Sequence, residues 1–187
     1  MRKVTYSLGL SLDGYVMDQG GGIDWAAPDE EVFRFCIEEV RGVGTHLMGR
    51  RLYETMLYWE DPAVVNDDAE REWVGVWCPL PKVVFSRTLT EVRGTATRLA
   101  RGGLAEEIAR LRAEPGEGDI AIGGAELAVQ AADLDLIDEY RARVYPVLLG
   151  GGTPFFAHAG RHVDLDLVET RTFASSRVVY LGYRVVR

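Results

Sequence analysis

The sequence predicts an α/β fold in three layers, α/β/α, with helices on both faces of a central, mostly parallel sheet and an antiparallel C-terminal edge. Two observations lead to this prediction. Apolar segments typical of strands alternate with segments whose apolar residues recur at helical spacing, and the last third holds two strand-like segments joined by residues 174–176. The 187 residues contain no linker and no internal repeat, so we expect one domain over residues 1–187.

The first strand is expected at residues 4–12, where an apolar run stops at the turn signal Asp13-Gly14. Residues 17–27 contain three successive glycines and are expected to form a loop. Pro28 is well placed to begin a helix, which Gly42 would end. The apolar face of this helix consists of Val32, Phe33, Cys36, Ile37 and Val40.

The middle of the chain continues the alternation of strands and helices. A strand at residues 43–48 is followed by a turn and a helix. Further strands are expected at residues 82–86 and 119–122, and further helices at residues 104–111 and 126–132. Residues 57–81, rich in Trp, Pro and Asp, allow no firm assignment, and a helix over residues 70–77 is one interpretation of the segment.

The last third of the chain is rich in β-forming residues. Residues 137–149 form a long strand-like segment that three glycines at 150–152 interrupt. Residues 164–172 and 177–186 are expected to form the terminal strand pair. This pair supplies the antiparallel edge of the predicted sheet.

Composition excludes several classes of function. The net charge of −8 argues against a non-specific nucleic-acid or anionic-membrane surface, because such surfaces need a positive field. The two cysteines, Cys36 and Cys78, are too few for a disulfide framework, and a reducing cytoplasm is the expected location. No apolar stretch approaches the roughly 20 residues of a membrane-spanning helix, and the polar residues that interrupt the first apolar run argue against a signal peptide.

Three predicted strands end at glycines or arginines. The residues at these ends are Gly49, Arg50 and Arg51, then Ser86 and Arg87, then Gly123 and Gly124. In open α/β sheets, ligands bind beyond the carboxyl ends of strands, where helix N-termini present free N–H groups. The sequence therefore predicts a phosphate-binding edge. The alternative, glycines that only form turns and arginines that are only solvated, stays open for each residue taken alone.

The order of these segments resembles the dihydrofolate reductase superfamily. The resemblance rests on SLDGYV (11–16), GGIDW (21–25), the helix after Pro28, LMGRRLYE (47–54), VVFSRT (83–88), IAIGGAEL (120–127) and YPVLLGGGTPFF (145–156). Together they cover nearly the whole chain. The SLDG and PVLLGGG motifs are closer to the C-terminal reductase domain of bacterial riboflavin biosynthesis than to true dihydrofolate reductases.

The resemblance implies that the protein binds NADPH and reduces a flat heterocycle. The nicotinamide would lie near Gly9, Leu12 and Val16, with residues 21–25 as a lid that Thr153 supports from the far side. The adenosine 2′-phosphate would face Arg50, Arg51, Ser86 and Arg87. The pyrophosphate would lie against Gly123, Gly124, Ala125 and Glu126. Gly49 and Ile122, at the ends of the same strands, are also expected to bind the cofactor. The absence of a Walker P-loop and of a G-x-G-x-x-G fingerprint argues against the other common nucleotide-binding folds.

The substrate half of the site is assigned by the same resemblance. Glu30 matches the acid that holds the substrate ring, although acids in the first turn of a helix also complement its dipole. The aromatic residues that would line a flat pocket are Trp25, Phe33, Trp59 and Tyr145. We expect a pterin or a sugar-linked aminopyrimidine as substrate, of the type reduced by 5-amino-6-(5-phosphoribosylamino)uracil reductase.

Two alternatives to this function stay open. The chain could be a non-catalytic nucleotide-binding or regulatory protein, or a reductase of an unrelated carbonyl compound. His158 and His162 have the spacing of helical metal ligands, but Gly160 between them and the lack of a third ligand lead us to expect no metal. The resemblance also implies a homodimer, and residues 137–149 are one place where two copies could pair.

Overall fold

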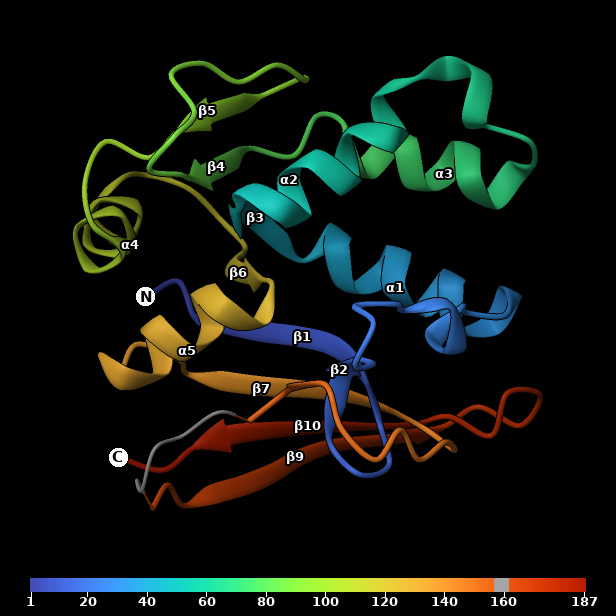
Figure 1. Ribbon diagram of the computed structural model, residues 1–187. Helices are drawn as coiled ribbons and strands as arrows, with labels where there is room; N and C mark the ends of the chain where they lie inside the picture. The colour runs from blue at the N-terminus through green and yellow to red at the C-terminus, as the bar shows by residue number, and fades with distance from the viewer. Residues whose placement is uncertain (157–161) are drawn as a thin grey trace.

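The structure, a computed structural model, describes residues 1–156 and 162–187. Within these residues one eight-stranded sheet has the order β5-β4-β3-β6-β1-β7-β10-β9 (Figure 1). Its strands are β1 (Val4–Ser11), β3 (Val43–Gly49), β4 (Lys82–Phe85), β5 (Thr97–Leu99), β6 (Asp119–Gly123), β7 (Glu139–Tyr145), β9 (Leu165–Thr172) and β10 (Val179–Val185). The strands from β5 to β7 pair in parallel, whereas β10 is antiparallel to both β7 and β9. The predicted mostly parallel sheet with an antiparallel C-terminal edge is confirmed.

Helices connect the parallel strands. They are α1 (Glu30–Arg41), α2 (Arg50–Met56), α3 (Asp68–Trp77), α4 (Leu104–Ala113) and α5 (Ala125–Asp133), with the short 3-10 helices η1 (Asp24–Ala26), η2 (Leu57–Glu60) and η3 (Pro62–Val64). A small second sheet pairs β2 (Tyr15–Met17) with β8 (Thr153–Pro154). The predicted helices are present, and α3 covers the region near residues 70–77 where a helix was suggested without a firm assignment.

The helices cover both faces of the sheet, which confirms the three-layer prediction (Figure 1). On one face, Ile108 of α4 and Ala131 of α5 pack with Val4, Tyr6 and other residues of the central strands. On the other face, α1 and α3 pack against β3 and β4, through residues that include Ile37, Trp77 and Val84. A third apolar cluster joins Val32 of α1 to the ends of β7 and β10. Successive residues of a strand point to opposite faces, so both layers draw on the same strands.

Helix α1 begins two residues later than Pro28. Asp29 is its N-cap, and the Asp29 carboxylate accepts a hydrogen bond from the backbone N–H of Val32 at 2.9 Å. Asp29 also accepts a hydrogen bond from the hydroxyl of Ser175, in the turn between β9 and β10. A capping acid typically stabilises a helix by about 1 kcal/mol. The start of α1 is therefore tied to the tip of the C-terminal strand pair.

Strand β7 is shorter than the predicted segment at residues 137–149. It ends at Tyr145, opposite Ser11, the last residue of β1, and Pro146 follows, which has no N–H for a strand ladder. Both edges of β7 are occupied, by β1 and by β10. The suggestion that two copies pair along this segment is therefore wrong for edge-to-edge pairing, because β7 has no free edge. Dimerisation itself stays a prediction.

A buried ion cluster attaches β5 to α4. The Glu107 side chain is fully buried and accepts hydrogen bonds from Arg98 at 2.8 and 3.0 Å, from Arg110 at 2.7 Å and from the backbone N–H of Arg101 at 2.6 Å. Burial alone would raise the pKa of Glu107, but these hydrogen bonds outweigh it and lower the pKa to about 2. The short edge strand β5 thus depends on a carboxylate of the following helix.

Candidate active site

The predicted phosphate-binding residues lie at one edge of the sheet. Strand β3 pairs in parallel with β4 and β6, so that Gly49 is opposite Phe85, and Met48 is opposite Gly123. The carboxyl ends of the three strands are therefore neighbours. Each leads into a segment that was predicted to hold phosphate, namely the start of α2, the turn at Ser86 and the start of α5.

Gly124 leaves open space where a ligand would approach. It is the N-cap of α5, has φ of +90°, and a Cβ built on it would meet no atom within 4 Å. No side chain caps the first turn of α5. Free N–H groups at the start of a helix favour anions. Gly49 is open in the same way, and both glycines therefore let a phosphate come close to the backbone.

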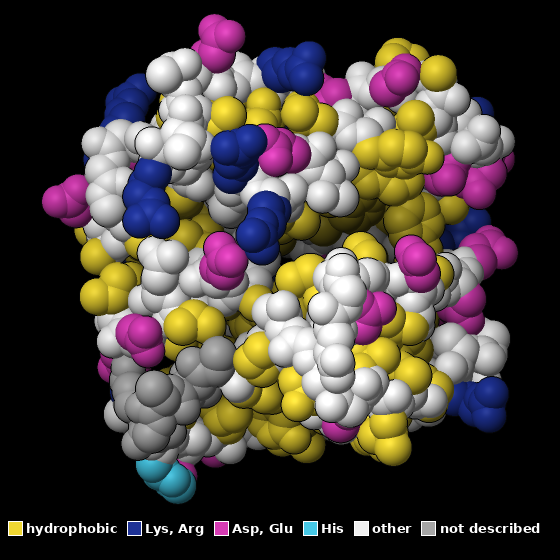
Figure 2. Space-filling view, in the orientation of Figure 1, with side chains coloured by type: hydrophobic (Ala, Val, Ile, Leu, Met, Phe, Trp, Pro, Cys, Tyr) yellow, Lys and Arg dark blue, Asp and Glu magenta, His cyan; other side chains and the backbone are white. Residues whose placement is uncertain are grey.

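Three arginines surround this edge. Arg50 donates to Glu54 and to the hydroxyl of Thr88, and Arg51 lies 3.6 Å from Glu126. Arg87 is exposed in the turn after β4, where the Ser86 hydroxyl accepts from the backbone N–H groups of Thr88 and Leu89. Figure 2 shows Lys and Arg side chains gathered around the start of α2, next to a hollow lined by hydrophobic side chains. The structure thus brings the predicted cations together.

Two predicted cofactor residues pack inward. Ile122 lies in the core at 1% exposure, and a Cβ on Gly123 would come within 2.4 Å of both His46 and Leu52. These residues can meet a cofactor only through their backbone. His46 also packs on Trp77 at 5.2 Å, and burial lowers the pKa of His46 to about 4, so the imidazole is neutral near pH 7. No sequence pattern identified His46 as a neighbour of this edge.

A second group of predicted residues meets at the end of β1. A Cβ on Gly9 would lie 3.0 Å from the ring of Tyr145 and 3.8 Å from Ala26 in η1. The neighbouring Trp25 contacts the same tyrosine ring edge-on, with centroids 5.9 Å apart. Gly9, Trp25 and Tyr145 therefore form one contact group.

The turn after β1, which precedes the lid, is anchored to the residues that follow β7. The Asp13 carboxylate accepts hydrogen bonds from the Ser11 hydroxyl at 2.6 Å and from the backbone N–H groups of Leu149 and Gly150. The Ser11 hydrogen bond is the main cause that lowers the pKa of Asp13. Gly152 has φ of +134°, and a Cβ there would collide with the carbonyl oxygen of Met17 at 1.9 Å. Only glycine fits at this position.

The other residues predicted to lie near the nicotinamide or to support the lid take defined positions around the Asp13 turn. Leu12 is 65% exposed, and its backbone N–H donates to Val147 at 2.8 Å, whereas Val16 is buried in β2. Thr153 of β8 pairs with Met17 of β2, and its support of the lid stays a prediction. Asp18 accepts from the backbone N–H groups of Gly20 and Gly22, both at 2.8 Å, and so fixes the turn of the glycine loop.

Phe33 and Trp59 meet in a separate aromatic group. Their rings stack with centroids 6.3 Å apart, and both contact Trp73 of α3, at 5.8 and 6.0 Å. The indole N–H of Trp73 is buried and has no hydrogen-bond partner within the described part of the chain. Trp73 was not predicted, because its segment shows no clear pattern. The four predicted aromatic residues therefore form two pairs, one on the lid and one between α1 and η2.

Glu30 lies on the outer face of α1. Its side chain is 75% exposed and pairs with Arg34 at 2.9 Å, and Arg34 in turn reaches Glu72 of α3. The contacts of Glu30 are thus not with the lid aromatics. The acid beside Tyr145 is Asp29, whose negative charge acts on the Tyr145 hydroxyl. The hydrogen bond from Ser175, followed by that from Val32, keeps the pKa of Asp29 below its usual value.

A buried ion pair between Arg143 and Glu39 lies beside Ser7, two residues before Gly9 in β1 and on the same face of the sheet. Arg143 of β7 donates to Ser7 of β1 at 2.8 Å and to the carboxylate of Glu39 on α1. Both charged side chains are 12% exposed. The pair joins α1 to the two strands that carry Gly9 and Tyr145, and so sets the distance between the helix and the floor of the candidate site. The sequence did not predict this ion pair, because Glu39 is one of several acids on an amphipathic helix.

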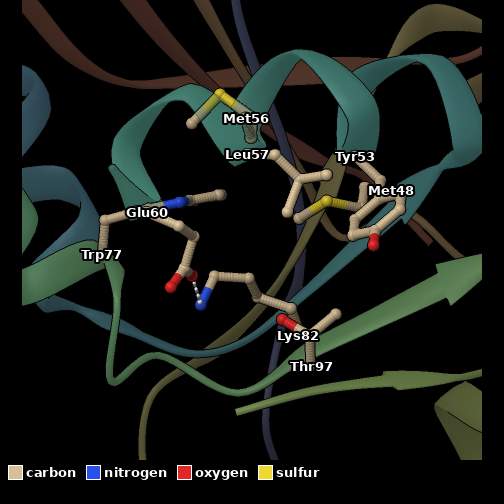
Figure 3. A pocket seen from close by; sticks show the side chains of 8 residues that line it. All are labelled: Met48, Tyr53, Met56, Leu57, Glu60, Trp77, Lys82 and Thr97. Carbon is tan, nitrogen blue, oxygen red and sulfur yellow. Dashed lines mark ion pairs between the residues drawn. The ribbon is translucent and has the colours of Figure 1, made fainter. Parts of the chain in front are cut away.

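A small cavity lies under α2 and η2 (Figure 3). Its lining residues are Met48, Tyr53, Met56, Leu57, Glu60, Trp77, Lys82 and Thr97. Lys82 points toward Glu60 at 4.0 Å and donates to the carbonyl oxygens of Cys78, Leu80 and Thr95. The cavity holds about one water molecule, which is too little for a nucleotide. Lys82 therefore serves the structure, by holding the end of α3 against the loop before β5.

Two further findings concern metals and membranes. Within residues 1–156 and 162–187, no group of three or more His, Cys, Asp or Glu side chains is arranged to hold a metal ion. His158 lies outside the described residues, and His162 pairs with Asp164 at 2.9 Å. Among the described helices, none has both the length and the apolar character that a membrane crossing requires.

The fold is that of an α/β domain of the dihydrofolate reductase type. A dihydrofolate reductase from Enterococcus faecalis, complexed with NADP(H), aligns over 99% of this chain and 97% of its own, with a TM-score of 0.63 and 14% identity. A putative riboflavin biosynthesis protein from Shewanella sp. PV-4 aligns over the whole of both chains, with a TM-score of 0.76 and 24% identity.

The RibD C-terminal domain model matches residues 2–179. The chain therefore belongs to the RibD C-terminal domain family, which confirms the resemblance drawn from its motifs. Among curated proteins, the uncharacterized protein YyaP of Bacillus subtilis (strain 168) is 32% identical over 184 residues, 97% of this chain and 94% of that protein.

Proposed function

We propose that this protein is an NADPH-dependent reductase that transfers a hydride to a flat heterocycle or a sugar-linked aminopyrimidine. One observation carries the proposal. The phosphate-binding edge at Gly49, Arg50 and Gly124 continues the carboxyl ends of the same sheet that places Gly9 against Trp25 and Tyr145. A dinucleotide can therefore have its phosphates at one group and its nicotinamide at the other.

The residues present fit this cofactor. Gly124 offers an open backbone and uncapped N–H groups to a pyrophosphate. Arg50, Arg87 and the Ser86 hydroxyl offer hydrogen-bond donors to a 2′-phosphate, which NADPH has and NADH lacks. The NADP(H) bound by the E. faecalis reductase, and the riboflavin-pathway names of the relatives, support the choice of cofactor and reaction.

The protein's own part in the reaction is to position and enclose. Bound NADPH would supply the hydride, because cofactors carry the chemistry that side chains cannot. Trp25 and η1 would cover the reacting atoms and exclude water, while the lack of a side chain at Gly9 lets the ring of Tyr145 lie against the backbone of β1. Phe33 and Trp59 would stack on a flat acceptor. Glu30, assigned by resemblance as the acid that holds the ring, stays a prediction.

Ligand-dependent unfolding tests the cofactor first. The purified protein is heated with NADPH, with NADH and without ligand, because a ligand that binds only the folded state raises its stability, by about 2.7 kcal/mol at 100 times Kd. We expect NADPH to raise Tm more than NADH at equal concentration. Equal shifts would remove the assignment of the 2′-phosphate site, and no shift with either at millimolar concentration would remove the proposal.

Turnover then separates a reductase from a binding protein. Oxidation of NADPH is followed with dihydrofolate, with 5-amino-6-(5-phosphoribosylamino)uracil and with simple aldehydes and ketones. We expect one of the two heterocycles to be reduced fastest. Reduction of only the simple carbonyl compounds would assign the protein to that class instead. NADPH binding without turnover of any acceptor would favour a non-catalytic nucleotide-binding protein.

A further inference from the structure

Tyr145 has a hydroxyl group for which the described residues provide no hydrogen-bond partner. Its side chain is 7% exposed, and yet the hydroxyl oxygen is not among the sealed polar atoms of the core, as that of Tyr6 is. A buried phenol normally finds a partner for its O–H. The hydroxyl of Tyr145 therefore reaches accessible space while its ring is packed in place.

The ring of Tyr145 is fixed between the floor of the candidate site and its lid. Tyr145 is the last residue of β7 and lies opposite Ser11 of β1. Its ring would be only 3.0 Å from a Cβ at Gly9, and it meets the indole of Trp25 edge-on at 5.9 Å. These contacts leave little freedom of rotation, so the hydroxyl keeps one place relative to the backbone of β1.

The surroundings keep the hydroxyl protonated. Burial, with smaller effects of Cys36 and Asp29, raises the pKa of Tyr145 to about 12, and the positive charge of Arg143 only partly opposes this. At neutral pH, Tyr145 is therefore a hydrogen-bond donor. An alkoxide or a deprotonated amine is a stronger base than this phenolate, so proton transfer from Tyr145 to either is favourable.

We propose that Tyr145 is the catalytic residue that gives the proton to the acceptor's heteroatom, a role that rests on the proposed reductase function. In this step the acceptor carbon gains a C–H bond with the electron pair that leaves C4 of the dihydronicotinamide, which is oxidised to nicotinamide. The π electrons of the acceptor's C=N or C=O bond move to the nitrogen or oxygen, which takes the proton of the Tyr145 hydroxyl. Water then returns a proton to the phenolate.

Tyr180 provides a matched control. It is also buried, at 3% exposure, lies on β10 opposite Arg143, and burial likewise raises its pKa. Its ring packs edge-on against Phe35 of α1, with centroids 4.7 Å apart, whereas the ring contact with Trp25 is made by Tyr145. Tyr180→Phe therefore removes a comparable hydroxyl from the same face of the sheet, but outside the candidate site.

The first measurement needs no turnover. The wild type, Tyr145→Phe and Tyr180→Phe are labelled with 13C at the ζ carbon of tyrosine, and the signal that each variant lacks assigns the two residues. NADPH should shift the Tyr145 signal, whereas 2′,5′-ADP, which has the adenosine phosphates but no nicotinamide, should not. If NADPH binds but leaves the Tyr145 signal unchanged, or if 2′,5′-ADP shifts it equally, the proposal is overturned.

Kinetics with the acceptor that the wild type reduces fastest provide the second measurement. Tyr145→Phe should lower kcat about 100-fold with NADPH affinity unchanged, because general acids typically contribute 10²- to 10⁴-fold, and Tyr180→Phe should retain the wild-type kcat. Equal kcat in the wild type and Tyr145→Phe would overturn the role of Tyr145 and leave the reductase intact. NADPH binding without reduction of any acceptor by the wild type would instead overturn the reductase function and this proposal together.

Discussion

Arg50 and Thr88 connect the carboxyl ends of two neighbouring parallel strands. The Nη1 atom of Arg50, at the start of α2, donates to the Oγ1 atom of Thr88, beyond the end of β4, at 2.9 Å. The same turn contains Arg87 and the Ser86 hydroxyl. A phosphate bound here would therefore meet donors from both strand ends at once, although these ends are far apart in the sequence.

Removing the arginines should abolish discrimination between NADPH and NADH. Arg50→Ala combined with Arg51→Ala should weaken NADPH binding about 30-fold, equivalent to about 2 kcal/mol, because charged hydrogen bonds to a phosphate contribute amounts of this order. The Kd of NADH should stay within about twofold. Titrations of both cofactors measure this, with Arg71→Ala on α3 as a control that removes an arginine whose side-chain exposure, 66%, lies between those of Arg50 and Arg51. A retained preference for NADPH would show that other donors bind the 2′-phosphate.

Loss of the Asp13 hydrogen bonds to Leu149 and Gly150 should weaken binding of the nicotinamide half of the cofactor alone. Asp13→Asn replaces an acceptor oxygen by a donor amide and weakens the hold on Leu149 and Gly150, which frees the start of the lid. We expect the Kd of NADPH to rise about tenfold, consistent with the loss of about 1.4 kcal/mol, while the Kd of 2′,5′-ADP stays constant. Asp61→Asn, which alters a similar turn at η3, is the control. An equal loss for both ligands would mean that Asp13 only stabilises the fold.

Glu30→Gln distinguishes a substrate ligand from a surface acid. If Glu30 holds the acceptor ring, as the resemblance implies, the KM of the acceptor should rise about tenfold, a loss typical of one charged hydrogen bond. The free energy of unfolding should change by less than about 0.5 kcal/mol, because exposed i,i+4 pairs such as Glu30 and Arg34 contribute little. Steady-state kinetics and urea unfolding measure the two quantities. An unchanged KM would remove the role, and Asp29→Asn is then the variant to compare.

Stability should fall in acid through Glu107. Its folded pKa of about 2 is lower than the roughly 4.3 of an unfolded glutamate, so its contribution is complete above about pH 4.3 and is lost as the pH falls toward 2. The contribution amounts to at most about 3 kcal/mol. Urea unfolding from pH 7 to pH 2 should therefore show a gap between the wild type and Glu107→Gln that narrows below about pH 4.3. A gap that is constant with pH would contradict the assignment.

The arrangement of the main parallel strands follows from local sequence patterns, whereas the short strands β2, β5 and β8 do not. The parallel strands and their helices have apolar periodicity, and the glycines at their ends mark the turns. Strand β5 has only three residues. Its Arg98 is held by Glu107 of α4, nine residues later in the chain. Strands β2 and β8 likewise form only because they pair with each other, although they are far apart in the sequence. Such elements exist because of contacts that are distant in sequence, and no local pattern records them.

The same distinction between predictable and unpredictable features holds for the candidate active site. The grouping of Gly49, Ser86 and Gly124 was predictable because the carboxyl ends of parallel strands meet at one edge. The direction of individual side chains was not. Gly123 faces His46 instead of a ligand. Glu30 and Val32 are two residues apart on α1, a rotation of about 200°, and therefore lie on opposite faces of the helix. Three successive acids at the start of a helix leave the register undefined until the helix is placed on the sheet.

The antiparallel course of β10 determines where the chain can be joined to another molecule. Val185 donates to Asp138, the residue before β7, and Val4 at the start of β1 accepts from Asp138 as well. Both ends of the chain therefore emerge together, on the edge of the sheet opposite the strand ends that form the site (Figure 1). An affinity tag, a fluorescent reporter or a surface tether can be attached at either end and leave the path of incoming ligands clear.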